Sequence, residues 1–302
     1  MTSYATDGTV GPWAEEKLKC LSKYLHAYTG IMRRQNWCKG YFYVDAFAGA
    51  GSALLRVLKD SENEMELLNG LSSWTDDSDV TQYVEGSPHR ALYLEHPFTQ
   101  YLFVEANSER CSKLEEIRKK YPDTLSVQVF QGDANDVLVN RVVENRHIDW
   151  KKYRAIVFLD PFGMHVPWQT LQTLAKTKAI EVIINFPVGM VIQRLLQVDG
   201  KIPENRRALL NDYFGTEEWE EVVYRNKADL FGDTAKKKVE DSGNKLASWY
   251  RQRLQDEFGY ATPARLIRNS QGAPLYYLLF AGPHPKGAEI AEHVLSQGEV
   301  IA

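Results

Sequence analysis

The residues with the clearest chemical potential are acids and glycines that follow apolar segments. The first apolar segment, residues 41–44, leads into Asp45, and Gly49 and Gly51 follow it closely. A β-branched and aromatic run of this kind is typical of a buried parallel strand. Glycines after such a strand allow positive φ and a close approach of the backbone to a ligand, because they lack Cβ. An ordinary turn between a strand and a helix would use the same glycines, so this motif alone leaves both readings open.

Later apolar segments also lead into polar residues. In chain order these are Glu105, Asp133, Asp160 and Asn185. In an open α/β sheet, ligands bind outside the carboxyl ends of the strands, at the point where the strand order reverses. We therefore expect these side chains to meet at one edge of a sheet and to line a ligand site. For Asp160 the alternative is a structural one, a cap on the loop that follows.

The segments between these motifs predict the strands and helices that position them. Strands are expected at about 41–46, 101–105, 125–130, 155–159 and 180–187, and helices at 12–35, 108–121, 136–146, 167–177 and 243–258. Ser87 is expected to cap another helix, which Pro88 begins. This alternation predicts an α/β fold with a mostly parallel sheet and helices on both faces. Runs at 261–268 and 275–281 predict a closing β-hairpin, followed by a short helix from 285.

The length of 302 residues predicts a single domain spanning 1–302, with two insertions. Residues 52–85 are an expected acidic insertion, because eight carboxylates and no Lys or Arg lie between Asp60 and Glu85. This segment is either a surface excursion or a lid over a ligand site. Residues 188–242 are an expected helical insertion after the fifth strand. Within it, Lys236–Lys238 form either a solvated helical face or a contact for nucleic acid.

Composition excludes several other classes. A net charge of −4 gives no global field for nucleic acid, so such binding would need a local patch. The three cysteines are widely spaced and the histidines form no ligand pattern, so we expect free thiols and no metal. No apolar run approaches the roughly 18 residues of a membrane span, and no secretory signal is evident. We expect a cytoplasmic protein without a membrane segment.

Taken together, the strand ends resemble the pattern of class I S-adenosylmethionine-dependent methyltransferases. In dinucleotide-binding folds the ribose-binding acid lies about 20 residues beyond the glycines. Glu105 lies much further from Gly51, and the expected insertion at 52–85 accounts for the difference. The resemblance implies that S-adenosylmethionine is the cofactor. It implies contacts to the amino-acid part from the first loop, to the ribose from Glu105 and to the adenine from the acid after the third strand; the full set is Asp45, Phe47, Ala48, Gly49, Gly51, Glu105, Asp133 and Ala134.

The segment Asp160-Pro161-Phe162-Gly163 resembles the Asp/Asn-Pro-Pro-aromatic motif of methyltransferases that modify exocyclic amines. In that motif a carboxylate and a backbone carbonyl accept hydrogen bonds from the amine, and the aromatic ring stacks on the base. The resemblance implies that Asp160 and Pro161 position the acceptor, while Phe162 and Asn185 line its pocket. The second proline is absent here and the aromatic residue lies one position early.

A more specific likeness covers most of the chain. The segments 43–49, 86–88, 103–105, 132–135, 158–163, 184–187 and 276–281 together resemble the three-Cys-motif partner (TcmP) family. This resemblance implies a methyltransferase-like Rossmann fold in bacteria, encoded beside a radical-SAM-like protein with a three-cysteine motif, which is the expected partner. The expected acceptor is an amine of a nucleobase or modified nucleotide. The long acidic insertion departs from the family pattern.

Two other functions stay open from the sequence. The chain could be a binding module that keeps a cofactor-sized site but acts as a non-catalytic partner of another enzyme or of nucleic acid. The variant Asp160 motif and the acidic insertion favour this reading. An NAD-dependent dehydrogenase uses similar strand ends, but the first turn lacks the third glycine and no hydride-transfer residues are evident.

Overall fold

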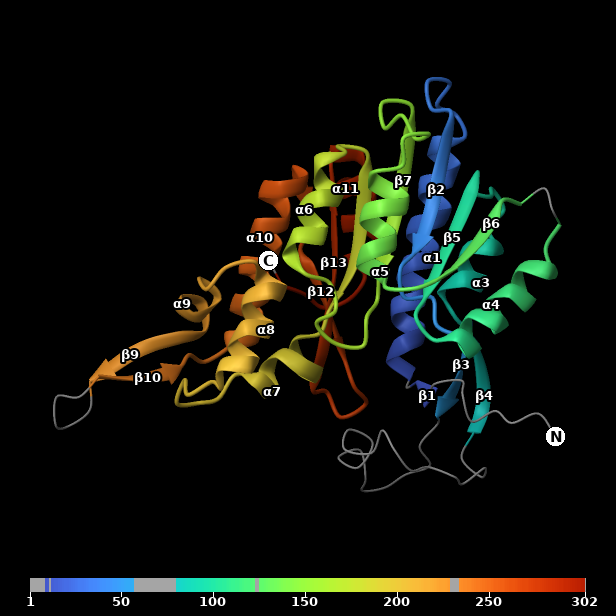
Figure 1. Cartoon of the computed structure of the whole chain (residues 1–302). Helices are drawn as coiled ribbons and strands as arrows, with labels where there is room; N and C mark the ends of the chain where they lie inside the picture. The colour runs from blue at the N-terminus through green and yellow to red at the C-terminus, as the bar shows by residue number, and fades with distance from the viewer. Residues whose placement is uncertain (1–8, 11, 57–79, 123–124, 229–233, 302) are drawn as a thin grey trace.

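The apolar segments form the strands of one nine-stranded sheet (Figure 1). The computed structural model describes residues 9–10, 12–56, 80–122, 125–228 and 234–301. The five predicted parallel strands are present as β2 (Gly40–Asp45), β5 (Gln100–Glu105), β6 (Val127–Gln131), β7 (Tyr153–Leu159) and β8 (Ile180–Phe186). They lie in the order β6-β5-β2-β7-β8 and are all parallel to their neighbours.

The direction of strand addition reverses at β2. The chain first places β5 and β6 on one side of β2, and then places β7 and β8 on the other side. The ends of β2 and β7 therefore define the topological switch point, where α/β sheets bind ligands.

The predicted hairpin closes the sheet. Strand β13 (Pro274–Gly282) pairs antiparallel with β8, and β12 (Ala264–Arg268) pairs antiparallel with β13. Two short strands, β11 (Tyr260–Ala261) and β14 (Val300–Ile301), extend the edge. The predicted fold class, a mostly parallel Rossmann-like sheet closed by a β-hairpin, is confirmed.

Helices cover both faces of this sheet. On one face the buried core includes residues of α1 (Pro12–Met32), α3 (Ser87–Leu92), α4 (Ser108–Lys119) and α11 (Pro285–Leu295). On the other face it includes residues of η2 (Val137–Val143), α6 (Trp168–Lys176), α8 (Glu204–Phe214), α9 (Trp219–Val223) and α10 (Ser242–Phe258). Because both faces are covered, the central strands are almost continuously apolar, and every residue of β8 is buried.

One carboxyl group is buried within this core. Glu181 of β8 accepts a hydrogen bond from the Tyr24 hydroxyl of α1 at 2.6 Å. Burial raises the pKa of Glu181 to about 7, and the bond from Tyr24 opposes that rise. The pair ties α1 to the middle of the sheet.

The predicted acidic insertion begins and ends in strands. Strands β3 (Ser52–Arg56) and β4 (Val80–Glu85) pair antiparallel, and β1 (Thr9–Val10) adds to β3, which makes a separate three-stranded sheet. The Gly86 amide donates to the Gly51 carbonyl at 2.9 Å, so the ends of the insertion meet. Residues 52–85 therefore leave and return at the same point, and α3 begins directly beside the turn that follows β2. Residues 57–79, and with them the question of a lid, lie outside the described residues.

The segment after β8 is helical for much of its length. It contains η3 (Val188–Ile192), α7 (Gln193–Leu195), α8 and α9, and then the hairpin formed by β9 (Tyr224–Ala228) and β10 (Thr234–Lys238). The expectation that Lys236–Lys238 lie on a helical face is wrong, because their backbone pairs with β9. In Figure 1 this hairpin projects at the lower left, with α8 between it and the sheet. Among the described residues no helix has the length and apolarity to cross a membrane.

Candidate active site at the strand ends

The turn after β2 lies between the ends of the two neighbouring strands. The Ala46 amide donates to the Phe158 carbonyl of β7 at 3.1 Å, and the Ala48 amide donates to the Val104 carbonyl of β5 at 2.9 Å. Gly49 and Gly51 have φ values of 62° and 80°, which L side chains rarely adopt. A Cβ on Gly49 would meet nothing within 4 Å, whereas one on Gly51 would clash with Ile117 of α4. The turn is thus packed against α4 at Gly51, whereas the space next to the Gly49 backbone is open.

Asp45 is fully buried at the start of this turn. Its carboxylate accepts hydrogen bonds from the Tyr43 hydroxyl at 3.2 Å, from the Phe47 amide at 3.4 Å and from the hydroxyl of Ser87. Burial raises the pKa of Asp45 to about 7; the Ser87 bond opposes this rise, and the charge of Asp160 adds to it. Asp45 is therefore a carboxyl group that changes charge near neutral pH.

The expected cap at Ser87 is wrong. Gly86 occupies the N-cap position of α3 without a side-chain bond, and Ser87 is the first residue of the helix. The Gly51–Gly86 contact starts the helix at this point, so the buried Ser87 hydroxyl reaches Asp45 instead. Ser87 thus joins the site, a role that the sequence did not indicate.

Glu105 at the end of β5 is buried and oriented by two donors. Its Oε1 accepts from the Asn107 amide at 2.8 Å and from the Arg110 guanidinium at 2.6 Å. Both donors belong to the loop and first turn of α4, with Asn107 as the N-cap of that helix. These bonds fix the plane of the carboxylate, and neither of them involves Oε2.

The loop after β6 uses Asp133 for a structural purpose. Its Oδ1 accepts from the amides of Asn135 and Asp136 at 2.8 and 3.1 Å, so Asp133 caps α5 (Ala134–Asp136). Ala134 is buried beside it. The Asn135 side chain donates to the His165 carbonyl at 2.9 Å, which fixes the β6 loop to the loop after β7. The sequence Asp-Ala-Asn contains the signal for this cap, but it does not indicate the bridge.

The acid after β7 is bonded to two side chains from other elements. Asp160 Oδ2 accepts from Lys17 Nζ at 2.5 Å, and Asp160 Oδ1 accepts from Asn185 Nδ2 at 2.7 Å. Lys17 belongs to α1, and its ammonium lies 5.3 Å from the centre of the Tyr276 ring. The structure therefore joins the ends of β7 and β8 through one carboxylate and neutralises that carboxylate with a lysine from the first helix.

The remaining predicted acceptor residues differ in exposure. Asn185 Oδ1 is buried and has no hydrogen-bond partner in the part of the chain that the structure describes. Pro161 is buried, and its carbonyl accepts from the Gly163 amide at 3.0 Å. The Phe162 side chain is 87% exposed, so its ring faces solvent. An orphan acceptor and an exposed aromatic ring thus lie on the two adjacent strand ends.

Lys17 was missed because its signal is indirect. It follows the helical spacing of the buried residues Leu21, Tyr24 and Tyr28, and only 9% of it is exposed. A lysine on the buried face of an amphipathic helix needs a charged partner, since an unpaired buried charge is costly. The sequence therefore held a reason to look for a carboxylate, although not for Asp160 in particular.

Comparison with known proteins supports the fold at low sequence identity. No protein-family model matches the chain, and no curated protein sequence does. Protein LPL1258 from Legionella pneumophila str. Philadelphia 1, described with the family model DUF519, is 13% identical with a TM-score of 0.50. That alignment covers 97% of this chain and 93% of that chain, and the likeness concerns the fold alone.

Other structural neighbours are described as methyltransferases. A putative S-adenosylmethionine-dependent methyltransferase from Listeria monocytogenes is 12% identical with a TM-score of 0.35, covering 88% of this chain and 98% of that chain. The plantazolicin methyltransferase BpumL, solved in complex with SAH, is 8% identical with a TM-score of 0.32, covering 88% and 84%.

The buried carboxyl groups predict a loss of stability as the pH rises. A carboxyl group whose pKa is raised on folding binds its proton more tightly in the native state. Its contribution to the free energy of unfolding is fully present below the unfolded pKa, and it is lost as the pH rises to the folded pKa. For Asp45 this window runs from about 4 to about 7. Between pH 5 and 7 the free energy of unfolding of Asp45→Asn should rise relative to that of the wild type by about 2–3 kcal/mol.

Urea unfolding at several pH values measures this difference. Glu181→Gln is a second variant with the same expected sign, since burial raises that pKa as well. Glu109→Gln, on the exposed first turn of α4, is the control and should follow the wild-type pH dependence. Parallel pH curves for Asp45→Asn and the wild type would contradict the assigned titration of Asp45.

The Lys17–Asp160 pair predicts an energetic coupling. Lys17→Met keeps the length of the side chain but leaves Asp160 without its cation, which should cost about 1–3 kcal/mol of unfolding free energy. Asp160→Asn should cost less in the Lys17→Met background than alone, because the charge it removes is then already unpaired. A double-mutant cycle by urea unfolding measures this coupling, and strictly additive losses would show that the pair contributes nothing.

Proposed function

We propose that the protein binds S-adenosylmethionine and transfers the methyl group to an amine of a nucleobase or modified nucleotide. The observation that carries this proposal is the convergence at the switch point of the open turn at Gly49, the oriented carboxylate of Glu105 and the Asp160–Asn185 cluster. Class I methyltransferases use these same strand ends, and the neighbouring structures described as methyltransferases agree with that class.

The residues present fit the cofactor. The open space beside Gly49 leaves room for a ligand against the backbone, and the fixed plane of Glu105 suits a pair of ribose hydroxyls. Asp45, Phe47, Ala48 and Gly51 would surround the amino-acid part. Asp133 and Ala134 would lie at the adenine, with Asp133 reaching it from its capping position. When bound, the cofactor supplies an electrophilic methyl group on a sulfonium, so the protein itself needs no nucleophile.

The acceptor amine would be oriented by the orphan oxygen at the end of β8. Asn185 Oδ1 is buried and unpartnered, and an amine N–H can satisfy it. Asp160 holds Asn185 in that orientation through the Nδ2 bond, while Lys17 holds Asp160. Accepting a hydrogen bond from the amine directs the nitrogen lone pair toward the methyl group, which is catalysis by positioning. The exposed ring of Phe162 offers a stacking surface for a base.

We also propose that the protein is a TcmP-type methyltransferase of the bacterial cytoplasm. The supporting observation is the set of motifs at the strand ends, which resemble those of the TcmP family. Its partner would be a radical-SAM-like protein with a three-cysteine motif.

One observation favours a second candidate, a non-catalytic partner protein with the same fold. Both oxygens of Asp160 are already bonded, to Lys17 and to Asn185, so this carboxylate has no need of an acceptor amine. If the protein is such a partner, Asp160→Ala should leave the biological activity intact in a complementation assay. If it is a methyltransferase, the same substitution should abolish that activity.

Calorimetry with S-adenosylhomocysteine tests the cofactor site. Wild-type protein should bind, and Glu105→Ala should bind roughly 10- to 100-fold more weakly, because a hydrogen bond to a charged group contributes about 1.5–3 kcal/mol. Glu109→Ala, in the first turn of α4 and exposed, is the matched control and should bind as the wild type does. An absence of heat at millimolar ligand, with folded protein, would reject the cofactor and with it the proposed reaction.

A further inference from the structure

The β9–β10 hairpin has two faces with different roles. Its strands carry five basic residues and no acidic one: Arg225, Lys227, Lys236, Lys237 and Lys238. The antiparallel register pairs Tyr224 with Lys238 and Asn226 with Lys236, so these residues share one face. It pairs Arg225 with Lys237 on the opposite face.

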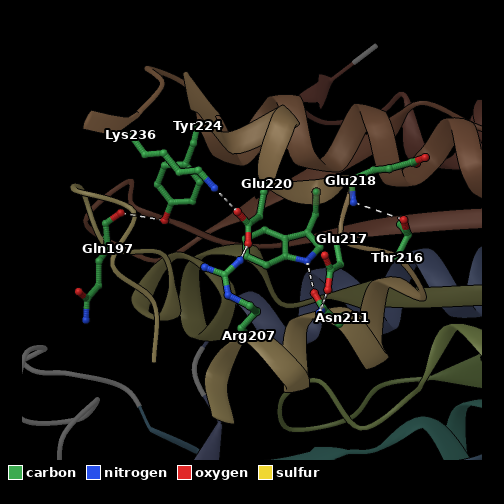
Figure 2. A network of polar contacts seen from close by, with 10 residues as sticks. Gln197, Arg207, Asn211, Thr216, Glu217, Glu218, Glu220, Tyr224 and Lys236 are labelled. Atoms are coloured by element: carbon green, nitrogen blue, oxygen red, sulfur yellow. Dashed lines mark hydrogen bonds and ion pairs between the residues drawn. The ribbon is translucent and has the colours of Figure 1, made fainter. Parts of the chain in front are cut away.

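The first face is anchored to the body of the protein, and Figure 2 shows its contacts at Tyr224 and Lys236. The Tyr224 hydroxyl donates to the Gln197 carbonyl at 2.8 Å, and Lys236 Nζ lies 2.6 Å from Glu220 Oε2. Glu220 also pairs with Arg207 of α8. Lys238 Nζ donates to the Leu196 carbonyl at 3.2 Å. The cations of this face are therefore used for attachment.

This attachment connects the hairpin to the candidate active site. Leu196 and Gln197 directly follow α7, in the segment that leaves the carboxyl end of β8 after Asn185. The hairpin is thus held by the stretch of chain that begins at the proposed acceptor site. A ligand lying along the hairpin would be fixed relative to that segment.

The second face carries the cations Arg225 and Lys237, which are not used for attachment. Arg225 and Lys237 are exposed, and neither forms an ion pair with any carboxylate in the described part of the chain. Within the described residues Arg225 donates to nearby backbone carbonyls, those of Glu221 and Tyr224. We call Arg225 and Lys237 the outer face of the hairpin.

The outer face continues into a surface hollow at its base. This hollow is lined by Arg225, Lys245 and Trp249 together with Glu218, Glu221 and Val222. Lys245 is exposed and Trp249 is partly exposed. The Trp249 ring makes an edge-to-face contact with Phe214, and the Arg253 guanidinium lies over the ring, 4.9 Å from its centre. Trp168 and Trp219, by contrast, are buried in the core. Trp249 thus has a ring that is held in place by its neighbours and lines the hollow together with Arg225 and Lys245.

We propose that the outer face and this hollow bind single-stranded nucleic acid. Phosphates would lie along Arg225 and Lys237, and a base would stack on Trp249 beside Lys245. Combining a cationic strip with an aromatic platform is how proteins hold single strands, since every base has a π-face to stack. A duplex cannot offer its bases in this way. The site is separate from the cofactor residues, and its occupancy does not require methyl transfer.

The two carboxylates of the hollow indicate which part of the ligand binds there. Glu218 and Glu221 disfavour a phosphate inside the hollow, but they can accept hydrogen bonds from the exocyclic amine of a base. The base therefore belongs in the hollow and the phosphates on the hairpin. The chain between the strands carries acidic residues at 229 and 233, so we limit the phosphate strip to the base of the hairpin.

Fluorescence anisotropy with a labelled single-stranded RNA of about 12 nucleotides tests the site, using the full chain without cofactor. We expect binding that weakens with salt. Arg225→Gln/Lys237→Gln should weaken it about tenfold and reduce the slope of log K against log salt by roughly 1.4, the value for two lost phosphate contacts. Lys119→Gln/Lys120→Gln, at the exposed end of α4, removes the same charge and should bind as the wild type does.

Two further measurements isolate the base. Trp249→Leu should weaken binding about tenfold, with its melting temperature recorded to show that the protein stays folded. An abasic oligonucleotide of equal length and a duplex of the same sequence should both bind more weakly than the single strand.

Equal losses in the outer-face and control variants would overturn the proposal, as would equal binding of the abasic strand. Binding of poly-glutamate as tight as that of RNA would instead indicate a general polyanion surface and would also overturn it. Calorimetry with S-adenosylhomocysteine is unaffected by these variants, so failure of the cofactor site and failure of the hairpin site are distinguishable.

Discussion

The constraint on which this structure depends is the parallel pairing of β2 on both of its edges. Because β5 lies on one side and β7 on the other, the turn after Asp45 must pass between two strand ends, and it is hydrogen-bonded to both. Helices cover both faces of these strands, so the polar groups of the sheet can be solvated only at its ends. Asp45, Glu105 and Asp160 accordingly lie at the carboxyl edge, whereas Glu181 stays within the core with Tyr24 as its partner.

Charge at that edge is balanced by a distant part of the sequence. Asp45 and Asp160 interact closely enough for the charge of one to raise the pKa of the other, and Asp45 is buried. Lys17 supplies the positive charge from the first helix and binds Asp160 directly. The outcome is a site with one neutralised carboxylate, one carboxyl group that titrates near neutrality, and an amide whose oxygen is left free. The three groups therefore differ in charge although they lie at neighbouring strand ends.

The fold was predictable because apolar segments that alternate with helical segments indicate a parallel sheet. The closing hairpin was predictable because two strand-like runs flank a turn. Side-chain partners were less predictable. The Asp133 cap was hidden in a motif assigned to the cofactor, and Ser87 moved from a cap to a bond with Asp45 because a glycine contact fixed where the helix begins. Lys17 and Asp160 are 143 residues apart, and no local pattern connects them.

The lysines of β10 show why local pattern fails in the insertion. Three consecutive cations have no periodicity, so their environment depends on which strand they pair with. The register with β9 sends Lys236 and Lys238 toward the body and Lys237 away from it, although the three side chains are chemically identical. A strand thus places two of these lysines against the body and leaves Lys237 without an ion pair among the described residues, whereas a helix would have spread the three around its surface. The net charge of the chain, at −4, conceals this separation. The distribution of charge at the base of the hairpin therefore follows from the strand register and cannot be read from the total charge.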